Sequence, residues 1–307
     1  MNVFVTGGAG FIGSHVVDMF LKNGLNVTVM DEMLHGDNLH HLEGHPNLRI
    51  IRSNINDVPT LRDGMKGMDA VYHLVANSDV QKGGKDPNLD FENTLLTTKN
   101  VLDVMVLNNV KKIFFASTSA VYGNRPGVAL REDSGSAPIS YYGASKVASE
   151  ALISSYAHMN DLSALVFRLP NVIGPRLTHG VIFDFMQKLK DDPKKLRILG
   201  NGKQTKEYIH VYDVIKAMEF IPIPSEPGME VYNVGTESTT SVIQIADIVC
   251  ESMGYKDVEY IFTGGDAGWK GDVPLFKYDI SKIKGVGWTN HYSSTDAVRK
   301  TLKNLME

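Results

Sequence analysis

The sequence predicts an α/β fold: a Rossmann-type doubly wound parallel sheet with a smaller, interleaved C-terminal α/β substrate domain. Strand-like and helix-like segments alternate through the first half of the chain, as in a parallel sheet covered by helices. A glycine-rich turn follows the first strand directly. With 307 residues, the chain exceeds the ~250 at which one core usually stops growing. We therefore expect a first domain over residues 1–172, rejoined by a segment at about 207–237, and a second domain over 173–307.

Short runs rich in β-branched and aromatic residues predict the strands of the first domain. They are Val3–Thr6, Val27–Asp31, Leu48–Ser53, Ala70–Leu74, Ile113–Ser117 and Ala164–Arg168. The helices expected between them are Phe11–Asn23, Asp57–Met65, Leu89–Asn108 and Tyr142–His158. After Pro170 the pattern predicts helices at Ile182–Lys190, Val211–Phe220 and Val242–Met253, with strands at Arg197–Leu199 and Glu230–Val234.

Composition excludes several classes of partner. The net charge of −4 gives no electrostatic basis for binding nucleic acid or an anionic membrane. No apolar run approaches the ~20 residues that a bilayer span requires, and the N-terminus lacks the features of a signal peptide. The single cysteine, Cys250, cannot form an internal disulfide, which fits a reducing compartment. We expect a cytoplasmic protein whose partners are small molecules.

The glycine-rich turn has the spacing of a dinucleotide-binding loop. Gly7 permits the tight turn, Gly10 allows the pyrophosphate to approach the backbone, and Gly13 allows close packing of the helix. The amides at the start of that helix, which includes Phe11 and Ile12, are suited to receive phosphates.

An acidic residue at the end of the second strand selects the cofactor. Asp31 stands where a carboxylate meets the ribose diol of the adenosine, and it would repel a 2′-phosphate. The sequence therefore favours NAD over NADP. Asn54 and Ile55, after the third strand, are expected to flank the adenine.

Tyr142 and Lys146 form the candidate acid–base pair. Their spacing of four residues places both side chains on one helix face. A phenol ionises near pH ~10, and a neighbouring ammonium together with an oxidised nicotinamide is expected to bring that pKa toward neutrality. Tyr142 is thus a plausible base for a sugar or alcohol hydroxyl. On its own this spacing also occurs on ordinary helix surfaces.

Several motifs in order resemble the extended short-chain dehydrogenase/reductase family, and within it the NAD-dependent nucleotide-sugar epimerases. They span almost the whole chain: Thr6–Gly13, His73-Leu-Val-Ala76, Asn93, Ser117–Gly123, Tyr142-x-x-x-Lys146, Arg168-Leu-Pro-Asn171 and Tyr208–Val211. The resemblance implies that Thr118 acts with Tyr142 and Lys146 in catalysis. It also implies further contacts to NAD, from Leu74, Val75, Ala76, Asn93, Ser117 and Lys146.

The resemblance also implies a set of residues that bind the substrate. They are Ser78, Thr118, Ser119, Asn171, Gly180, Val181, Arg197, Leu199, Lys206, Trp269, Asp272 and Phe276. Lys206 stands where many relatives carry arginine, and Trp269 replaces the arginine of a phosphate-binding loop. Phe276 limits the room around the sugar's C2 substituent or packs in the core.

The residues after Thr118 bear on the type of reaction. Related 4,6-dehydratases carry Asp-Glu at the positions of Ser119 and Ala120, and related decarboxylases usually carry glutamate at the position of Ala120. The resemblance thus implies 4-epimerisation of a nucleotide sugar, first UDP-glucose/UDP-galactose, through a transient 4-keto intermediate. UDP-glucuronate 4-epimerisation or another NDP-sugar oxidoreductase activity is the alternative, and a non-catalytic NAD sensor is a rival of another class.

Two further expectations concern metals and assembly. The histidines at 35, 40, 41 and 45 have no accompanying cysteine and no convergent spacing, so we expect no metal site. Family resemblance implies a homodimer formed by a four-helix bundle. The stretch Val101–Leu107 and the face around Ala148, Leu152 and Tyr156 could form it, or could be buried within one subunit.

Overall fold

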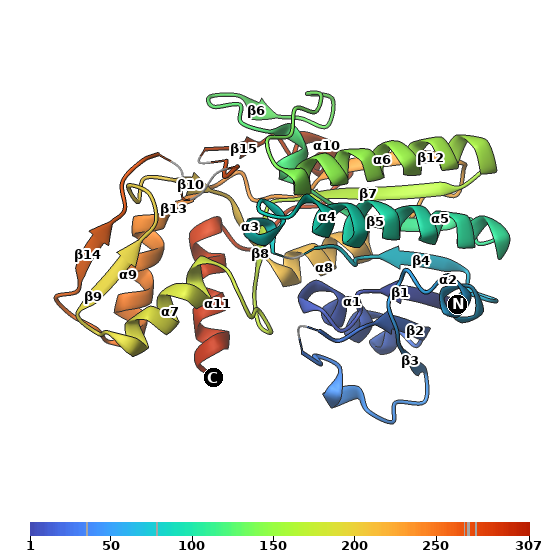
Figure 1. The fold of residues 1–307 in the computed structure, drawn as a ribbon, viewed down its shortest axis with the longest axis horizontal. Helices are drawn as coiled ribbons and strands as arrows, with labels where there is room; N and C mark the ends of the chain where they lie inside the picture. Colours follow the sequence, from blue (N-terminus) through green and yellow to red (C-terminus); the bar gives the residue numbers. More distant parts are fainter. Residues whose placement is uncertain (35, 78, 267, 269–270, 274) are drawn as a thin grey trace. The chain divides into compact units, whose positions relative to one another are not determined.

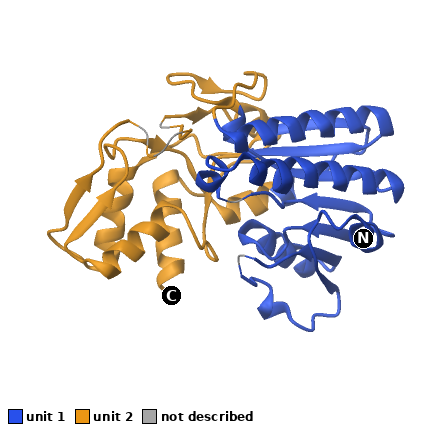
Figure 2. Ribbon diagram, viewed as in Figure 1, with its two compact units in different colours: residues 1–121, 140–168, 218–232 blue, residues 122–139, 169–217, 233–307 orange. Residues whose placement is uncertain are grey.

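A computed structural model describes residues 1–34, 36–77, 79–266, 268, 271–273 and 275–307. These residues form two compact units, shown in Figure 2. Unit 1 comprises residues 1–121, 140–168 and 218–232, and unit 2 comprises residues 122–139, 169–217 and 233–307. The chain thus crosses between the units more often than the sequence suggests, because residues 122–139 group with unit 2 and only residues 218–232 return to unit 1.

A seven-stranded sheet organises unit 1, as the sequence predicts (Figure 1). Its spatial order is β12-β7-β5-β4-β1-β2-β3. The strands are β1 (Asn2–Thr6), β2 (Asn26–Asp31), β3 (Leu48–Arg52), β4 (Ala70–His73), β5 (Lys112–Thr118), β7 (Ser163–Leu169) and β12 (Gly228–Asn233). The pairs β1–β2, β1–β4, β2–β3 and β4–β5 are parallel. The order reverses beside β1, and ligands of such sheets bind at the carboxyl ends of the strands near this reversal.

Alternate side chains of a strand point to opposite faces of the sheet, and both faces of this sheet are buried. Tyr72, Phe114 and Phe167 form a row of aromatic rings on neighbouring strands, with Phe20 of α1 against Tyr72. On the other face Phe115 belongs to the core cluster that includes side chains of α5 and α6. Continuous apolar strands are typical of parallel sheets covered on both sides.

The helices of unit 1 follow the predicted pattern with one difference. They are α1 (Phe11–Lys22), η1 (His40–Leu42), α2 (Val58–Gly64), α3 (Val80–Gly83), α4 (Pro87–Asp90), η2 (Phe91–Leu96), α5 (Thr97–Leu107) and α6 (Tyr141–Asn160). The segment predicted as one helix over Leu89–Asn108 is helical from Pro87 to Leu107, but it is not a single regular α-helix, since the π-helical segment η2 lies between α4 and α5. Periodicity did not reveal it, because the apolar residues continue through all three segments. Helices α5 and α6 lie side by side in Figure 1.

Unit 2 combines short strands with a group of three packed helices, α7, α9 and α11. Four strand pairs are present: β10 (Thr205–Lys206) with β13 (Thr240–Ser241), β11 (Tyr208–His210) with β8 (Asn171–Ile173), β14 (Glu259–Phe262) with β9 (Lys195–Ile198), and β15 (Lys277–Tyr278) with β6 (Ala129–Leu130). The helices are α7 (Val181–Asp191), α9 (Val242–Met253), α10 (Ser281–Gly285) and α11 (Ser294–Met306). Two further segments continue across the unit boundary, η3 (Ser119–Tyr122) and α8 (Val211–Phe220). A capping box of Ser241 and Gln244 starts α9, and Gly254 in a left-handed conformation ends it.

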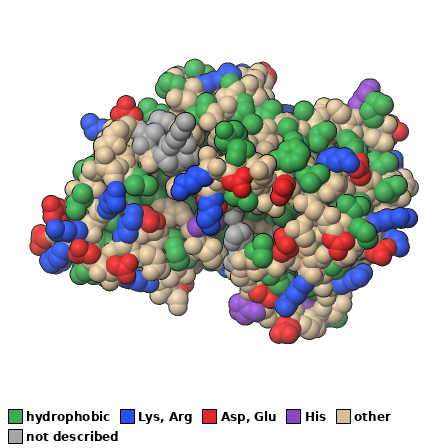
Figure 3. Space-filling model, viewed as in Figure 1, with side chains coloured by type: hydrophobic (Ala, Val, Ile, Leu, Met, Phe, Trp, Pro, Cys, Tyr) green, Lys and Arg blue, Asp and Glu red, His purple; other side chains and the backbone are tan. Residues whose placement is uncertain are grey.

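Acidic and basic side chains are interspersed on the face shown in Figure 3, in keeping with the small net charge. None of the helices in the described part of the chain has both the length and the apolar character needed to cross a bilayer.

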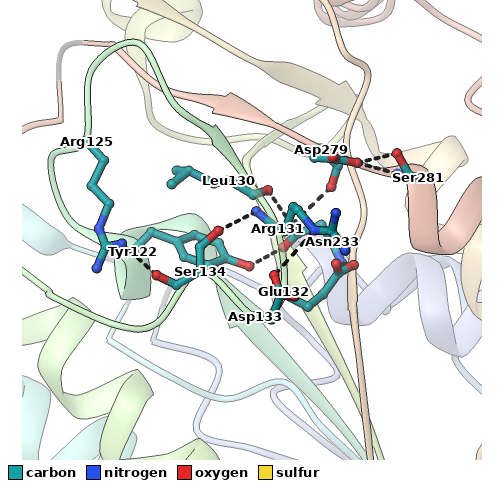
Figure 4. Close-up of polar contacts among 10 residues, drawn as sticks. All are labelled: Tyr122, Arg125, Leu130, Arg131, Glu132, Asp133, Ser134, Asn233, Asp279 and Ser281. Carbon is teal, nitrogen blue, oxygen red and sulfur yellow. Dashed lines mark hydrogen bonds and ion pairs between the residues drawn. The ribbon is translucent and has the colours of Figure 1, made fainter.

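Asn233 joins separate segments of unit 2, as Figure 4 shows. Its Oδ1 accepts a hydrogen bond from the Tyr122 hydroxyl at 2.6 Å, and its Nδ2 donates to the carbonyl oxygens of Leu130 (2.8 Å) and Asp279 (3.2 Å). Its backbone N–H donates to Glu132 at 2.7 Å. The side chain is fully buried, so each lost contact would leave a polar group without water.

We predict that Asn233→Ala lowers the free energy of unfolding by about 2–4 kcal/mol, because it removes the acceptor of the buried Tyr122 hydroxyl and the side-chain donor to the Leu130 and Asp279 carbonyl oxygens. Denaturant unfolding measures this change. The half-buried Asn108, whose Nδ2 makes a solvent-exposed hydrogen bond to the Arg62 carbonyl, provides the matched control Asn108→Ala, for which we expect less than ~1 kcal/mol. Equal losses of unfolding free energy in the two variants would show that the buried hydrogen bonds of Asn233 contribute no more to stability than the exposed one of Asn108.

Candidate active site

The glycine turn after β1 has no space for side chains. Gly7 has φ of 70°, and a Cβ there would lie 2.8 Å from the Val75 nitrogen. A Cβ on Gly13 would lie 2.0 Å from the Gly7 carbonyl oxygen. Gly10 is the N-cap of α1 and provides no side-chain cap. The start of α1, with Phe11 and Ile12, thus keeps its first amides available for an anion, and the cradle fits a dinucleotide pyrophosphate.

Asp31 at the end of β2 faces this turn. Its Oδ2 accepts a hydrogen bond from the Ala9 N–H at 2.9 Å, and its Oδ1 accepts from the Met33 N–H at 2.7 Å. The carboxylate is therefore fixed beside the glycine loop, where a ribose diol can reach it. Of the residues expected to flank adenine, Asn54 accepts from the Asn56 N–H at 2.7 Å, whereas Ile55 is 3% exposed and belongs to the hydrophobic core.

A buried hydrogen-bond chain connects the first strand to α5 through His73. The Thr6 hydroxyl lies 2.8 Å from Nδ1 of His73, and Nε2 lies 3.0 Å from the Thr98 hydroxyl. Thr98 itself donates to the Thr94 carbonyl, so the pattern assigns the proton to Nε2. Burial lowers the pKa of His73 to about 3, so the ring is neutral. The N–H groups of Leu74 and Val75 also donate to Thr6 Oγ1, and Ala76 follows them directly in the chain.

The structure brings Thr118, Tyr142 and Lys146 together within unit 1. Thr118 ends β5, and Tyr142 lies in the first turn of α6, whose N-cap Ser140 accepts a hydrogen bond from the Gly143 N–H. Hydrogen bonding by the Thr118 hydroxyl acts to lower the pKa of Tyr142, so this hydroxyl lies near the phenol. Lys146 is only 2% exposed, and its Nζ donates to the Ala116 carbonyl at 2.6 Å and lies 5.9 Å from the Tyr142 ring centroid.

The pKa values of this pair differ from the expectation. Burial raises the pKa of Tyr142 to about 12, with the Thr118 hydrogen bond acting to lower it and the charge of Asp90 acting to raise it. Burial lowers the pKa of Lys146 to about 7, while Glu150 acts to raise it. The protein groups alone therefore do not bring the pKa of Tyr142 toward neutral pH, because the effect of burial outweighs that of Thr118.

Glu150 is a neighbour of the site that sequence patterns did not single out. Its Oε1 accepts hydrogen bonds from the Ser117 hydroxyl and from Nε of Arg168 (3.1 Å), and its Oε2 accepts from Nη2 of Arg168 (2.7 Å). Ser117, expected to contact the cofactor, thus uses its hydroxyl to hold this carboxylate.

The loop after β4 is held by Thr94 and Asp90. The Asn77 N–H donates to the Thr94 hydroxyl at 3.2 Å, and the Asn77 Nδ2 donates to Asp90 Oδ1 at 2.8 Å. Thr94 is fully buried in η2, and the neighbouring Asn93 is partly exposed. The contact of Asn93 to the cofactor stays a prediction, and its buried neighbour Thr94 makes the hydrogen bond to the loop after β4.

Within unit 2, the expected phosphate contacts fall into two groups. Asn171 on β8 donates both its N–H (3.3 Å) and its Nδ2 (3.1 Å) to the carbonyl oxygen of Glu207. Lys206 forms an ion pair with Asp272, which also accepts from the Gly268 N–H at 3.0 Å. The Lys206 side chain is 20% exposed, so its ammonium can still approach an anion.

Other expected substrate residues are placed as follows. Gly180, with φ of 97°, precedes Val181 at the start of α7. Arg197 and Leu199 are exposed on and just after β9. Phe276 is 8% exposed and packs edge-on against Tyr278. Ser119 begins η3, and Ser78 and Trp269 lie outside the described residues.

Comparisons with known proteins agree with this geometry. Residues 3–235 match the model of the NAD-dependent epimerase/dehydratase family. A putative UDP-glucose 4-epimerase of Methanocaldococcus jannaschii is 30% identical over 306 residues, covering 98% of this chain and 97% of the relative.

Two solved structures align over the whole chain. UDP-glucose 4-epimerase of Thermus thermophilus in complex with NAD aligns with a TM-score of 0.88 and 30% identity, covering 100% of this chain and 99% of that one. UDP-glucuronic acid 4-epimerase of Bacillus cereus, in complex with UDP-glucuronic acid and NAD, aligns with a TM-score of 0.90, 27% identity and the same coverage. Together with the glycine cradle, these matches identify NAD as the cofactor.

We predict that Asp31→Ala raises the Kd for NAD roughly tenfold, which corresponds to ~1.4 kcal/mol, because the ribose diol loses its acceptor. It should also narrow the preference for NAD over NADP, since the carboxylate that repels a 2′-phosphate is gone. Titration calorimetry with both cofactors measures these changes. Asp63→Ala, at an exposed acid paired with Lys66, is the control. An unchanged NAD affinity would contradict the assignment.

Proposed function

Because the chain belongs to the NAD-dependent epimerase/dehydratase family and is an enzyme of that family, we propose that it epimerises a nucleotide sugar at C4, with UDP-glucose and UDP-galactose as its first candidates. The observation that carries this proposal is the convergence of Thr118 at the end of β5 with Tyr142 and the buried Lys146, which lie one helical turn apart on α6. A protein that only binds a dinucleotide needs no base such as Tyr142 and no hydroxyl such as Thr118 beside it. Their convergence beside the β5 terminus therefore favours an enzyme over a sensor.

The residues divide the work of proton transfer. Tyr142 takes the proton of the sugar O4 hydroxyl and later returns it, while the Thr118 hydroxyl stabilises the phenolate by donating to its oxygen. NAD, held by the glycine turn and Asp31, would supply the acceptor for the hydride of C4 and then the hydride donor for the opposite face of the 4-keto sugar. The ammonium of Lys146 favours the ionised phenol electrostatically and is placed to hold the nicotinamide ribose.

The residues after Thr118 support epimerisation over dehydration. Ser119 and Ala120 carry no carboxyl group, and the Ala120 N–H donates to the Thr118 hydroxyl at 3.2 Å. Elimination of water across C5 and C6 needs an acid and a base at the sugar, and this segment provides neither. Oxidation and reduction at C4 require only the groups already described.

Substrate recognition falls to unit 2 in this proposal. Asn171 and Lys206 are placed to hold the diphosphate, and the exposed Arg197 and Leu199 to contact the base. Lysine offers a single cationic point where a guanidinium offers a planar fork, so Lys206 grips phosphate without bidentate geometry. The similarity to a UDP-glucuronic acid 4-epimerase makes UDP-glucuronate the alternative substrate.

The second proposal concerns assembly as a homodimer. An apolar groove between η2 and α6 is lined by Phe91, Leu95, Leu96, Ala148, Ala151 and Leu152. Phe91 is 52% exposed, which is unusual for a large ring unless a partner covers it. Val101, Leu102, Val104 and Met105 are instead buried in the core of unit 1. Within the stretch Val101–Leu107, Val106 and Leu107 remain exposed, whereas Ala148 and Leu152 of α6 line the groove.

We predict that Tyr142→Phe lowers kcat by about 10²–10⁴-fold, because the variant keeps the ring and loses the group that carries the proton. Incubation with UDP-galactose, UDP-glucose, UDP-glucuronate and the N-acetylated forms, followed by chromatography, measures turnover. The exposed Tyr141→Phe on the same turn is the control and should retain wild-type activity. Activity of Tyr142→Phe above a tenth of wild type would show that another group is the base.

We predict that Ala151→Glu converts a dimer into a monomer, since it places a charge in the apolar groove without disturbing the core. Sedimentation velocity measures the assembly state. Met159→Glu changes a 76% exposed position on the same helix outside the groove and should remain dimeric. If wild type itself sediments as a monomer at micromolar concentration, the groove is not a subunit interface.

A further inference from the structure

The Glu150–Arg168 pair is a fully internal ion pair in the unit that carries the catalytic residues. Its side chains are 8% and 9% exposed, and Arg168 binds both carboxylate oxygens of Glu150. Removing such a pair from water costs several kcal/mol per ion, and apolar residues of similar volume often give equal or greater stability. Stability alone therefore does not explain this pair.

The position of the pair connects the segments on which the chemistry depends. Glu150 follows Lys146 by one turn of α6, and its carboxylate accepts the hydroxyl of Ser117, the residue directly before Thr118. Arg168 is contributed by β7, the strand beside β5. One carboxylate thus fixes the rotation of α6 about its axis relative to the end of β5.

Glu150 is also the acid that acts on the Lys146 ammonium. The other groups around Lys146 are the neutral His73 of β4, the Phe115 ring at 4.5 Å and the Ala116 carbonyl of β5, and Tyr142 on its own helix. Asp90 of α4 acts on Tyr142, and Arg168 of β7 faces Glu150. Burial lowers the pKa of Lys146 to about 7 and Glu150 opposes this, so loss of the carboxylate would release the proton of Lys146 at lower pH.

We propose that Glu150, held by Arg168 and Ser117, is a positioning residue that orients Lys146 beside Tyr142 and keeps its ammonium charged during turnover. The inference rests on the proposed roles of Tyr142 and Lys146. Arg168 tempers the negative charge that Glu150 presents, so the two members of the pair act on Lys146 with opposite sign.

We predict that the two members shift the pH profile of kcat in opposite directions. Glu150→Gln removes the carboxylate and leaves the Arg168 cation, so Lys146 deprotonates earlier and the alkaline limb moves down by about 1 pH unit. Arg168→Gln leaves the carboxylate without its partner, so the alkaline limb moves up. Ser117→Ala keeps both charges and should leave the limb in place. A purely structural pair would lower kcat and Tm without moving the limb.

The matched control is the exposed pair of Glu251 and Arg299 in unit 2. Glu251→Gln makes the same chemical change where solvent screens the charge, and it should alter neither kcat nor its pH profile. Shifts of the same direction in Glu150→Gln and Arg168→Gln, or no shift in either, would overturn the proposal. If Glu150→Gln does not fold, Arg168→Gln decides alone, since an unmoved alkaline limb rejects the role.

A measurement without substrate separates this inference from the proposed function. The ultraviolet band of the phenolate, taken as the difference between the NAD-loaded enzyme and its Tyr142→Phe variant, follows the ionisation of Tyr142 directly. In Glu150→Gln this ionisation should move to higher pH, because Lys146 no longer carries its charge. If the wild type shows no turnover but Glu150→Gln shows this shift relative to it, the epimerase proposal is rejected and the role of Glu150 is retained. If the wild type turns over but Glu150→Gln shows no shift in the ionisation of Tyr142, the role of Glu150 is rejected and the epimerase proposal is retained.

Discussion

The candidate active site depends on an ammonium group placed where water scarcely reaches it. Lys146 is almost fully buried, and one carbonyl oxygen and one aromatic ring are its immediate contacts. Burial of a charge is tolerated only where nearby groups compensate for the lost hydration. In this protein the compensation comes from the Ala116 carbonyl near the end of β5 and from Glu150, one turn later on α6. The charge of Lys146 therefore depends on how α6 packs against the sheet.

The polar groups around the buried Lys146 limit the charge that is added beside it. His73 is neutral and satisfied on both ring nitrogens by threonines, so it adds no second positive charge beside Lys146. Asp90 has one oxygen held by Asn77, and among the described residues its other oxygen has no hydrogen-bond partner. Burial raises the pKa of Asp90, so the acid whose charge acts on the Tyr142 phenol is itself one whose charged form is disfavoured.

Much of unit 1 was predictable from the sequence, because local patterns determine it. The strand, glycine turn, helix and following acid lie within 31 residues, and each has one dominant physical explanation. Contacts between distant segments were not predictable in this way. Glu150 lies 18 residues from Arg168 and 33 from Ser117, and nothing in the spacing marks the three as neighbours. Residues 122–139 group with unit 2, where Asn233 contacts Tyr122 across 111 positions of the sequence, and no local pattern predicts this.

The π-helical segment between α4 and α5 has a consequence for how this part of the chain tolerates length changes. A π-turn accommodates one more residue than an α-turn, so the helix on each side keeps its own angular register. Asp90 can face Asn77 before the segment while Thr98 faces His73 after it. Shortening Phe91–Leu96 by a single residue would turn one of these faces by roughly 100° with respect to the other, since each residue of a helix accounts for that rotation. The π-helical turn therefore sets the angular offset between the two helix segments, so that Asp90 can contact the loop at Asn77 while Thr98 contacts the sheet at His73.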